Sequence, residues 1–351
     1  MVRTIGYAAL SPTTHLVPFA FDRRELRPAD IAIEILYCGM CHSDLHQCRN
    51  DWGVATYPLV PGHEIVGRVI ACGDEAHRHS VGDLVAVGPL VDSCQACPAC
   101  LAGEVQKCER WATQTYADRD RLTGEPTQGG YSRHLVLRES FAYRVPAGLD
   151  PARTGPILCA GMTTWSPLRH AGVGPGSKVA VAGLGGLGHM GIKLAAALGA
   201  EVCVLSRTAQ KEADARALGA HDFLLTTDPT AMKAASARFD LVLDTIPVRH
   251  DVGPMVQLLG DDGVLAIAGY IGVVDGIDTR ALMGRRRSVT ACTIGGQAMH
   301  QELLDFCAEH GVVPECEIIP VSRIEEAFER MERSDVRYRF VIDLGTMPAE
   351  G

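Results

Sequence analysis

Alternating apolar and polar residues mark roughly the first 150 residues as rich in β-strands. Residues 30–36, 65–70 and 83–87 alternate with a period of two, as half-buried strands do. Gly and Pro residues separate these segments, which is typical of an irregular β unit. The pattern predicts a β-rich domain in this part of the chain.

From about residue 151 the pattern changes to short apolar runs separated by helical segments. Continuous apolar runs suit parallel strands that are buried on both faces. The expected strands span residues 178–182, 201–205, 222–225, 240–243, 263–268 and 289–293, with helices at 189–198 and 211–218. This alternation predicts an α/β fold with a doubly wound parallel sheet.

A third pattern begins at about residue 294. Residues 301–310 and 323–333 have helical periodicity, and residues 339–344 form a final apolar strand. We expect this tail to fold back onto the β-rich part. A discontinuous domain of residues 1–150 and 294–351 would then be interrupted by a second domain of residues 151–293. A chain of 351 residues exceeds the size of one core, which favours two domains.

The net charge and the lengths of the apolar runs indicate which partners and which location to expect. The formal net charge of −9 disfavours a nucleic acid or an anionic membrane as the main partner. No apolar run reaches the roughly 20 residues that a membrane helix needs, and no secretory signal is evident. We therefore expect a cytoplasmic enzyme.

Four cysteines in one short segment give the sharpest local signal, at Cys94, Cys97, Cys100 and Cys108. Four thiolates satisfy a tetrahedral zinc ion completely, which makes such a site structural. The alternatives are scattered buried thiols or a redox pair. The odd total of 13 cysteines at irregular spacing argues against a disulfide framework.

Cys41 and His63 indicate a second metal site. A thiolate and an imidazole are ligand types that zinc prefers, and the best candidate for a third ligand is Cys159. Three protein ligands would leave a fourth position open for water or substrate, which is the catalytic arrangement. Most single Cys–His pairs have no such role, so this prediction depends on the neighbouring motifs.

A glycine-rich segment follows the strand expected at residues 178–182. It has the G-x-G-x-x-G pattern, with Gly183, Gly185, Gly186, Leu187 and Gly188 as candidate cofactor-binding residues. A strand before it and a helix after it form the context in which a dinucleotide pyrophosphate binds. A purely structural glycine turn is the alternative.

The end of the next strand predicts which dinucleotide binds. An NAD site would place an acidic residue there for the ribose hydroxyls, but this chain has Ser206 and Arg207, with Lys211 close behind. A carboxylate would repel a 2′-phosphate, whereas hydroxyls and a guanidinium would bind it. NADP(H) is therefore the expected cofactor. An Arg that merely lies in an exposed loop is the alternative.

Together these motifs resemble the zinc-dependent medium-chain dehydrogenases, and more closely their cinnamyl alcohol dehydrogenase branch. The resemblance covers essentially the whole chain. Its marks are the four-Cys segment, the glycine-rich turn and residues 38–46, 61–64, 126–131, 159–163 and 337–343. It implies a GroES-like catalytic domain, a Rossmann-like domain, one catalytic and one structural zinc ion, and a homodimer formed through the edge of the nucleotide-binding sheet.

The resemblance also implies roles for single residues. Cys41, His63 and Cys159 match the catalytic zinc ligands, and the four-Cys segment matches the structural zinc lobe. Glu64 matches a carboxylate near the metal, and Asp44 matches one that orients a metal-bound imidazole.

Ser43 matches the hydroxyl that takes the alcohol proton, and His46 matches the outer end of a proton relay to solvent. His42 lies where some relatives carry Arg near the pyrophosphate. Thr163, in the segment after Cys159, joins His42 among the expected cofactor-binding residues.

The reaction implied by the resemblance is hydride transfer between NADP(H) and a primary alcohol or aldehyde of aryl, allylic or medium-chain type. Zinc would polarise the carbonyl or stabilise the alkoxide, in a cleft between the two domains. The alternatives are a secondary-alcohol or polyol dehydrogenase and a non-enzymatic zinc- and dinucleotide-binding protein. Trp52, Trp111, Trp165 and residues 294–299 are candidates for the pocket lining or, equally, for core packing.

Overall fold

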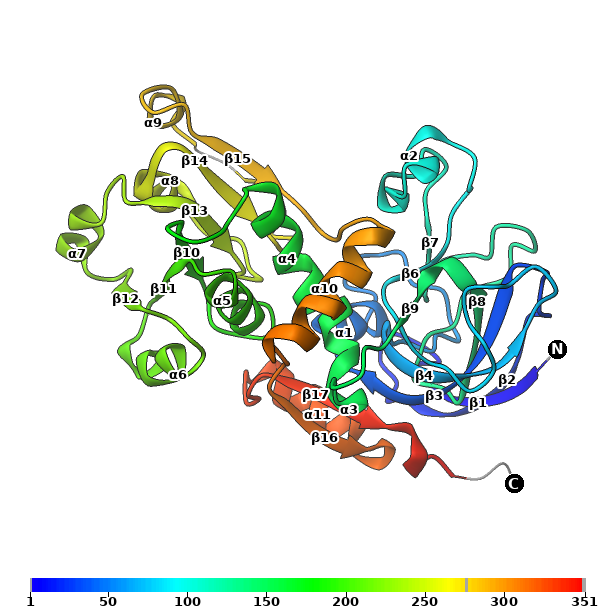
Figure 1. Cartoon of the computed structure of the whole chain (residues 1–351). Coiled ribbons are helices and arrows are strands. Elements are labelled where there is room, and N and C mark those ends of the chain that lie inside the picture. Colours follow the sequence, from blue (N-terminus) through cyan, green and yellow to red (C-terminus); the bar gives the residue numbers. More distant parts are fainter. Residues whose placement is uncertain (1, 275–276, 349–351) are drawn as a thin grey trace. The chain divides into compact units, whose positions relative to one another are not determined.

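The computed structural model describes residues 2–274 and 277–348 of the chain, which Figure 1 colours from blue to red along the sequence. The chain divides into two compact units. Unit 1 combines Met1–Cys159 with Gly295–Gly351, and unit 2 is the continuous stretch Ala160–Ile294. Within the described residues, no helix is both long and apolar enough to cross a membrane.

A seven-stranded sheet forms the centre of unit 1. Along the sheet the order is β16 (Cys316–Pro320), β17 (Arg339–Asp343), β3 (Asp30–Gly39), β4 (Glu64–Cys72), β5 (Leu84–Val87) and β9 (Ala142–Arg144), and β8 (His134–Arg138) pairs with β3. The tail strand β17 lies antiparallel to β3, with Val341 opposite Gly39. The tail therefore completes a sheet that begins near the other end of the chain.

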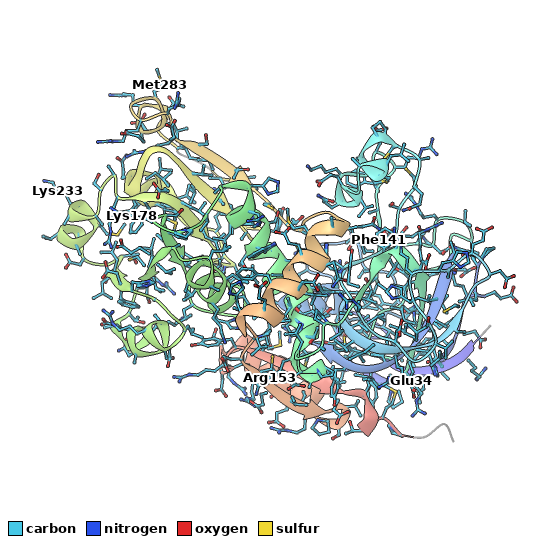
Figure 2. The ribbon with its side chains drawn as sticks, viewed as in Figure 1. Glu34, Phe141, Arg153, Lys178, Lys233 and Met283 are labelled. Atoms are coloured by element: carbon cyan, nitrogen blue, oxygen red, sulfur yellow. The ribbon has the colours of Figure 1, made fainter. Side chains whose placement is uncertain are left out.

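The part of unit 1 that the structure describes also contains two smaller sheets and five α-helices. The small sheets pair β1 (Val2–Ala8) with β2 (Val17–Arg23) and β6 (Leu90–Asp92) with β7 (Thr113–Gln114). The helices are α1 (His42–Cys48), α2 (Pro98–Leu101), α3 (Pro151–Thr154), α10 (Gln297–His310) and α11 (Ile324–Glu332). Phe141, labelled in Figure 2, is fully buried in the hydrophobic core of this unit.

A six-stranded parallel sheet forms the centre of unit 2. Its order is β12 (Asp222–Leu225), β11 (Glu201–Ser206), β10 (Lys178–Ala182), β13 (Phe239–Asp244), β14 (Leu259–Ile267) and β15 (Ser288–Ala291). In β10 only the first residue, Lys178, is exposed, because the strand is buried on both faces. The order 3-2-1-4-5-6 is that of a dinucleotide-binding sheet. This confirms the predicted fold class.

Among the described residues, six α-helices accompany this sheet: α4 (Ala160–His170), α5 (Gly188–Ala197), α6 (Glu212–Ala217), α7 (Pro229–Ala234), α8 (Gly253–Leu258) and α9 (Thr279–Met283). Asp228 begins α7 by accepting hydrogen bonds from two backbone N–H groups, and Pro229 occupies the first helical position, where no N–H is needed. The helix expected at 211–218 starts as a 3₁₀ turn at Ala209–Lys211 and continues as α6.

Candidate functional site

Cys41, His63 and Cys159 converge within unit 1. The Cys41 Sγ lies 3.9 Å from the Cys159 Sγ, which in turn lies 3.3 Å from the His63 Nε2. Together with a Glu64 oxygen, these ligand atoms all lie within 4.8 Å of one another. A tetrahedral zinc ion with bonds of about 2.3 Å to sulfur holds its ligand atoms about 3.8 Å apart. The donor types and their spacing therefore fit a zinc ion.

Two neighbouring strands bring the ligands together. Strand β3 ends at Gly39, directly opposite Glu64 at the start of β4, so that Cys41 and His63 leave the same end of the pair. A Cβ on residue 39 would lie 2.1 Å from the Glu64 Oε2. Position 39 therefore requires glycine, because any other side chain would displace the carboxylate.

Asp44 orients the imidazole. Its carboxylate is fully buried and accepts hydrogen bonds from the backbone N–H of Cys41 at 2.8 Å and of Gly62 at 3.1 Å. The His63 Nδ1 lies 3.2 Å from the same carboxylate, which leaves Nε2 as the nitrogen available to a metal. Burial opposes a charge on His63, but Asp44 outweighs it and raises the pKa of His63.

The surroundings favour a thiolate, the form of Cys that binds metals, at Cys41. Hydrogen bonding with Cys159 and the nearby Arg339 guanidinium hold the pKa of Cys41 well below its usual value, whereas the same hydrogen bond and burial raise the pKa of Cys159. Arg339 is only 4% exposed and donates to the Glu64 Oε1 at 3.1 Å and the Met40 carbonyl at 3.2 Å. Burial raises the pKa of Glu64, and Arg339 opposes that effect.

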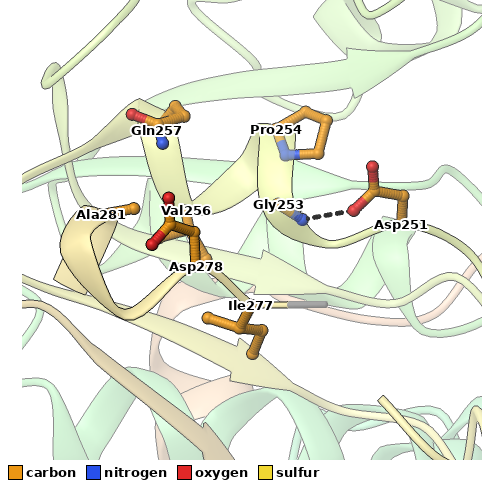
Figure 3. Close-up of a pocket in the computed structure, with 8 residues that line it drawn as sticks. All are labelled: Asp251, Gly253, Pro254, Val256, Gln257, Ile277, Asp278 and Ala281. Atoms are coloured by element: carbon orange, nitrogen blue, oxygen red, sulfur yellow. Dashed lines mark hydrogen bonds between the residues drawn. The ribbon is translucent and has the colours of Figure 1, made fainter. Parts of the chain in front are cut away.

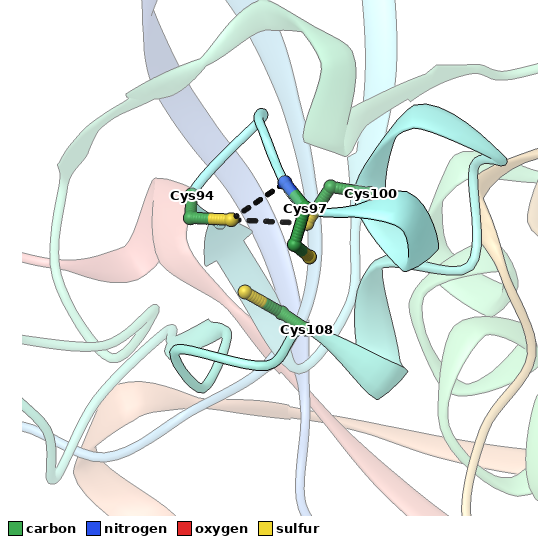
Figure 4. Close-up of side chains that lie close together, drawn as sticks. All are labelled: Cys94, Cys97, Cys100 and Cys108. Carbon is green, nitrogen blue, oxygen red and sulfur yellow. Dashed lines mark hydrogen bonds between the residues drawn. The ribbon is translucent and has the colours of Figure 1, made fainter.

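The four-Cys segment forms a second cluster in unit 1, separate from the first (Figure 4). The Sγ atoms of Cys94 and Cys100 are 3.7 Å apart, and the four sulfur atoms lie within 4.8 Å of one another. Val105 and three of the four cysteines are buried, whereas Leu101 is 74% exposed. The arrangement fits a fully coordinated zinc ion that would hold the segment together.

In unit 2 the glycine-rich turn connects β10 to α5. Gly183 has a positive φ of 93°, and a Cβ on Gly188 would lie 2.2 Å from the Gly183 carbonyl oxygen. The fold therefore requires glycine at positions 183 and 188, whether or not a ligand binds. A Cβ on Gly185 would meet nothing within 4 Å. The turn therefore keeps open space above Gly185, next to the N-terminus of α5.

The residues expected to select the dinucleotide lie beside this turn. The Gly183 N–H donates to the Leu205 carbonyl at 3.2 Å, which places the end of β11, and hence Ser206, at the same edge of the sheet. The Lys211 Nζ donates to the Leu184 carbonyl at 3.3 Å. Arg207 is exposed one residue beyond β11.

The remaining predicted residues lie on helices. His42, Ser43 and His46 belong to α1, where His42 is exposed and the other two are half-buried. The His46 Nδ1 pairs with the Asp51 Oδ2 at 2.7 Å. Thr163 is half-buried on α4 in unit 2.

Three residues around the predicted metal ligands were not assigned a role from the sequence. Tyr131 donates its hydroxyl to the Asp44 Oδ2 at 3.3 Å, the Tyr116 ring stacks on His63 with centroids 5.8 Å apart, and Arg339 pairs with Glu64. The signal for Arg339 is a charged residue that starts an apolar strand. Tyr131 follows two adjacent glycines, which indicates close backbone packing.

A hollow in unit 2 is lined by Asp251, Gly253, Pro254, Val256, Gln257, Ile277, Asp278 and Ala281 (Figure 3). None of the predicted site residues lines it. Its two carboxylates accept hydrogen bonds from backbone N–H groups, Asp251 from Gly253 at 2.8 Å and Asp278 from Arg280 at 2.9 Å. These acidic residues therefore serve the starts of α8 and α9.

Comparison with known proteins places the chain in a family. Residues 27–147 match the model of the alcohol dehydrogenase GroES-like domain, and residues 186–309 match that of the zinc-binding dehydrogenase. NADP-dependent alcohol dehydrogenase C of Mycobacterium bovis is 45% identical over 347 residues, which are 99% of this chain and 100% of that one. The chain belongs to the zinc-binding medium-chain dehydrogenases of the cinnamyl alcohol dehydrogenase type.

Two further relatives agree with this assignment. A probable formaldehyde dehydrogenase of Bacillus subtilis is 46% identical over 326 residues, covering 93% of each chain. The solved structure of a cinnamyl alcohol dehydrogenase from Sorghum bicolor superposes with a TM-score of 0.95 at 39% identity and covers 100% of both chains. This dehydrogenase is therefore an oxidoreductase, as the motifs predicted.

Proposed function

We propose that this chain is a zinc-dependent alcohol dehydrogenase that interconverts a primary alcohol and its aldehyde with NADP(H). The observation that carries the proposal is the convergence of Cys41, His63 and Cys159 at a spacing that suits zinc. We assign catalysis to unit 1, which contains all three of these ligands, and dinucleotide binding to unit 2.

The metal sites have different roles in this proposal. Cys41, His63 and Cys159 hold a catalytic zinc ion, and Cys94, Cys97, Cys100 and Cys108 hold a structural one. When bound, the catalytic ion supplies Lewis-acid polarisation of the substrate oxygen, and NADP(H) gives or accepts the hydride. Glu64, buried beside the ligands and paired with Arg339, keeps a carboxylate within reach of the site.

The protein's own residues move the proton. Ser43 exchanges it with the substrate hydroxyl, and His46 passes it to solvent. These two residues are three apart on α1, so they share a face of the helix. The His46 side chain is 41% exposed and its Nδ1 is paired with Asp51, which leaves Nε2 to exchange protons with water.

The dinucleotide binds at the turn between β10 and α5. The backbone of Gly183, Gly185, Gly186, Leu187 and Gly188 approaches the pyrophosphate, while Ser206, Arg207 and Lys211 bind the 2′-phosphate. His42 and Thr163 contribute further contacts. A relative that aligns with 99% of this chain is named as NADP-dependent, which supports the choice of NADP(H) over NAD(H).

The substrate is a small aldehyde or alcohol. Relatives are named for formaldehyde and for cinnamyl alcohol, and we favour aryl, allylic or medium-chain compounds. We further propose a cytoplasmic homodimer that forms through β15, which is one of the two edge strands of the parallel sheet.

The decisive experiment measures oxidation of NADPH and NADH with cinnamaldehyde, benzaldehyde, aliphatic aldehydes and formaldehyde, together with zinc content. We expect turnover with NADPH and two zinc ions per chain. Cys159→Ser should lose one zinc ion and all turnover but keep its fold by circular dichroism. Activity that survives this substitution would refute the ligand assignment, and equal rates with both nucleotides would refute the role of Ser206 and Arg207.

A further inference from the structure

The segment Gln128-Gly129-Gly130-Tyr131 forms a ladder of hydrogen bonds with residues 60–62, directly before His63. The bonds run from Val60 N to Gln128 Oε1 at 2.7 Å, Gly129 N to Val60 O at 2.7 Å, Gly130 N to Gly62 O at 2.9 Å and Tyr131 N to Pro61 O at 2.9 Å. The Gln128 side chain also donates to the Pro58 carbonyl at 3.0 Å. Every residue of this segment therefore helps to hold in place the backbone that leads to His63.

The two segments pack too closely for side chains between them. A Cβ on Gly129 would lie 2.4 Å from the Pro61 carbonyl oxygen, and one on Gly130 would lie 2.4 Å from the Ile65 side chain. Gly62 has a φ of 106°, and a Cβ there would lie 2.6 Å from the Tyr131 ring. The glycines thus allow Tyr131 to lie against the backbone that leads to His63.

Tyr131 reaches the imidazole by a second route. Its side chain is fully buried, as is that of Asp44, and its hydroxyl donates to the Asp44 Oδ2 at 3.3 Å. The other oxygen of Asp44 faces the His63 Nδ1. A fixed carboxylate holds the ring of a metal-binding histidine in one orientation and one tautomer.

A buried cation holds the segment from its other side. Arg23 is only 7% exposed and donates to the carbonyls of Gln128 and Gly129, the Ser132 hydroxyl and the His134 carbonyl. The guanidinium fork is suited to binding several oxygens in a fixed geometry. Movement of the segment would leave these donors buried without partners, which is costly.

We propose that residues 128–131, held by Arg23, position His63 for metal binding, and that Tyr131 is a positioning residue that acts through Asp44. The inference rests on the proposed function, because it concerns the ion bound by Cys41, His63 and Cys159. Loss of a group that hydrogen-bonds directly to a metal ligand, as Asp44 does to His63, typically weakens metal binding about 10- to 100-fold. We expect the loss of the Tyr131 hydroxyl to fall at the lower end of this range, because the backbone N–H groups of Cys41 and Gly62 and the His63 ring still hold Asp44.

The test compares Tyr131→Phe with Tyr57→Phe in the full zinc-loaded chain. The Tyr57 hydroxyl donates to the Cys48 carbonyl at 2.8 Å, so the control loses one phenolic hydrogen bond that does not involve Asp44. Zinc release to a chelator and thermal unfolding are measured for both, and the absorption spectrum of the cobalt-substituted site is recorded. The ion held by four cysteines serves as an internal reference.

We expect Tyr131→Phe to bind the catalytic ion about tenfold more weakly and to shift the cobalt spectrum, with release of the four-Cys ion unchanged. Tyr57→Phe should alter neither signal. Identical zinc release and spectra for the two variants would overturn the inference while leaving the proposed function intact. If Cys159→Ser bound as much zinc as the unmodified chain, the metal site itself would be wrong, and the inference would fail with it.

Discussion

Substitution of Gly185 offers a direct test of cofactor binding, because it is expected to affect the stability of the fold and the affinity for the cofactor differently. A methyl group there meets no protein atom within 4 Å, and the residue is not among those with positive φ. Replacing glycine by alanine at a compatible position stabilises a protein by about 0.4–1 kcal/mol through the unfolded state. Gly185→Ala should therefore unfold at the same or a slightly higher temperature.

The affinity for the cofactor should fall, although the stability of the protein does not. If the space above Gly185 is reserved for the pyrophosphate, a methyl group costs about 1–3 kcal/mol of overpacking, which is roughly a 5- to 150-fold weaker affinity. Titration of NADPH fluorescence measures this Kd, and thermal unfolding without nucleotide measures stability.

Two control variants complete the experiment. The methyl group of Gly174→Ala also meets nothing within 4 Å. This variant should change the stability as Gly185→Ala does, but leave the Kd for NADPH unchanged. Gly188→Ala places its methyl 2.2 Å from the Gly183 oxygen and should destabilise the protein even without nucleotide. An unchanged Kd for Gly185→Ala would refute the assignment of this space to the phosphates.

Two further predictions concern cofactor choice and pH. Ser206→Asp should raise the Kd for NADPH at least about tenfold but not that for NADH, because a carboxylate repels the 2′-phosphate; titrations that show equal losses for both would contradict this. Burial opposes ionisation of Asp120, but the Arg27 guanidinium at 2.6 Å outweighs it and holds the pKa of Asp120 well below its usual value. The ionised carboxylate therefore stabilises the fold above about pH 4, and this stability is lost as the pH falls. In urea unfolding, the advantage over Asp120→Asn should shrink below about pH 4; a constant difference would refute the pairing.

The parts of the molecule that follow local rules were predictable from the sequence. Strands such as β10 and β13 are short apolar runs because both of their faces are buried. The cysteines of the four-Cys segment are near neighbours along the chain. The glycine-rich turn carries its own context, since a strand and a helix flank it.

Features that depend on distant residues were not predictable. The Tyr131 hydroxyl reaches Asp44 across 87 positions of sequence, and no local pattern encodes such a contact. Arg23 ends a strand, where an arginine is ordinarily exposed, yet backbone carbonyls from residues 128–134 surround it. Helix α1 has only seven residues, which is too short for a helical period to stand out.

The pairing of β17 with β3 also sets an order of events during synthesis. Residues 160–294 are contiguous, so they can collapse as soon as they leave the ribosome. By contrast, the last residues of β3, which pair with β17, must wait for a partner about 300 residues later, on the order of half a minute at typical elongation rates. Arg339, the partner of Glu64, arrives with that same strand. A ribosome that stalls before residue 339 would thus leave unit 2 complete but attached to a unit 1 that lacks β17 and the partner of Glu64.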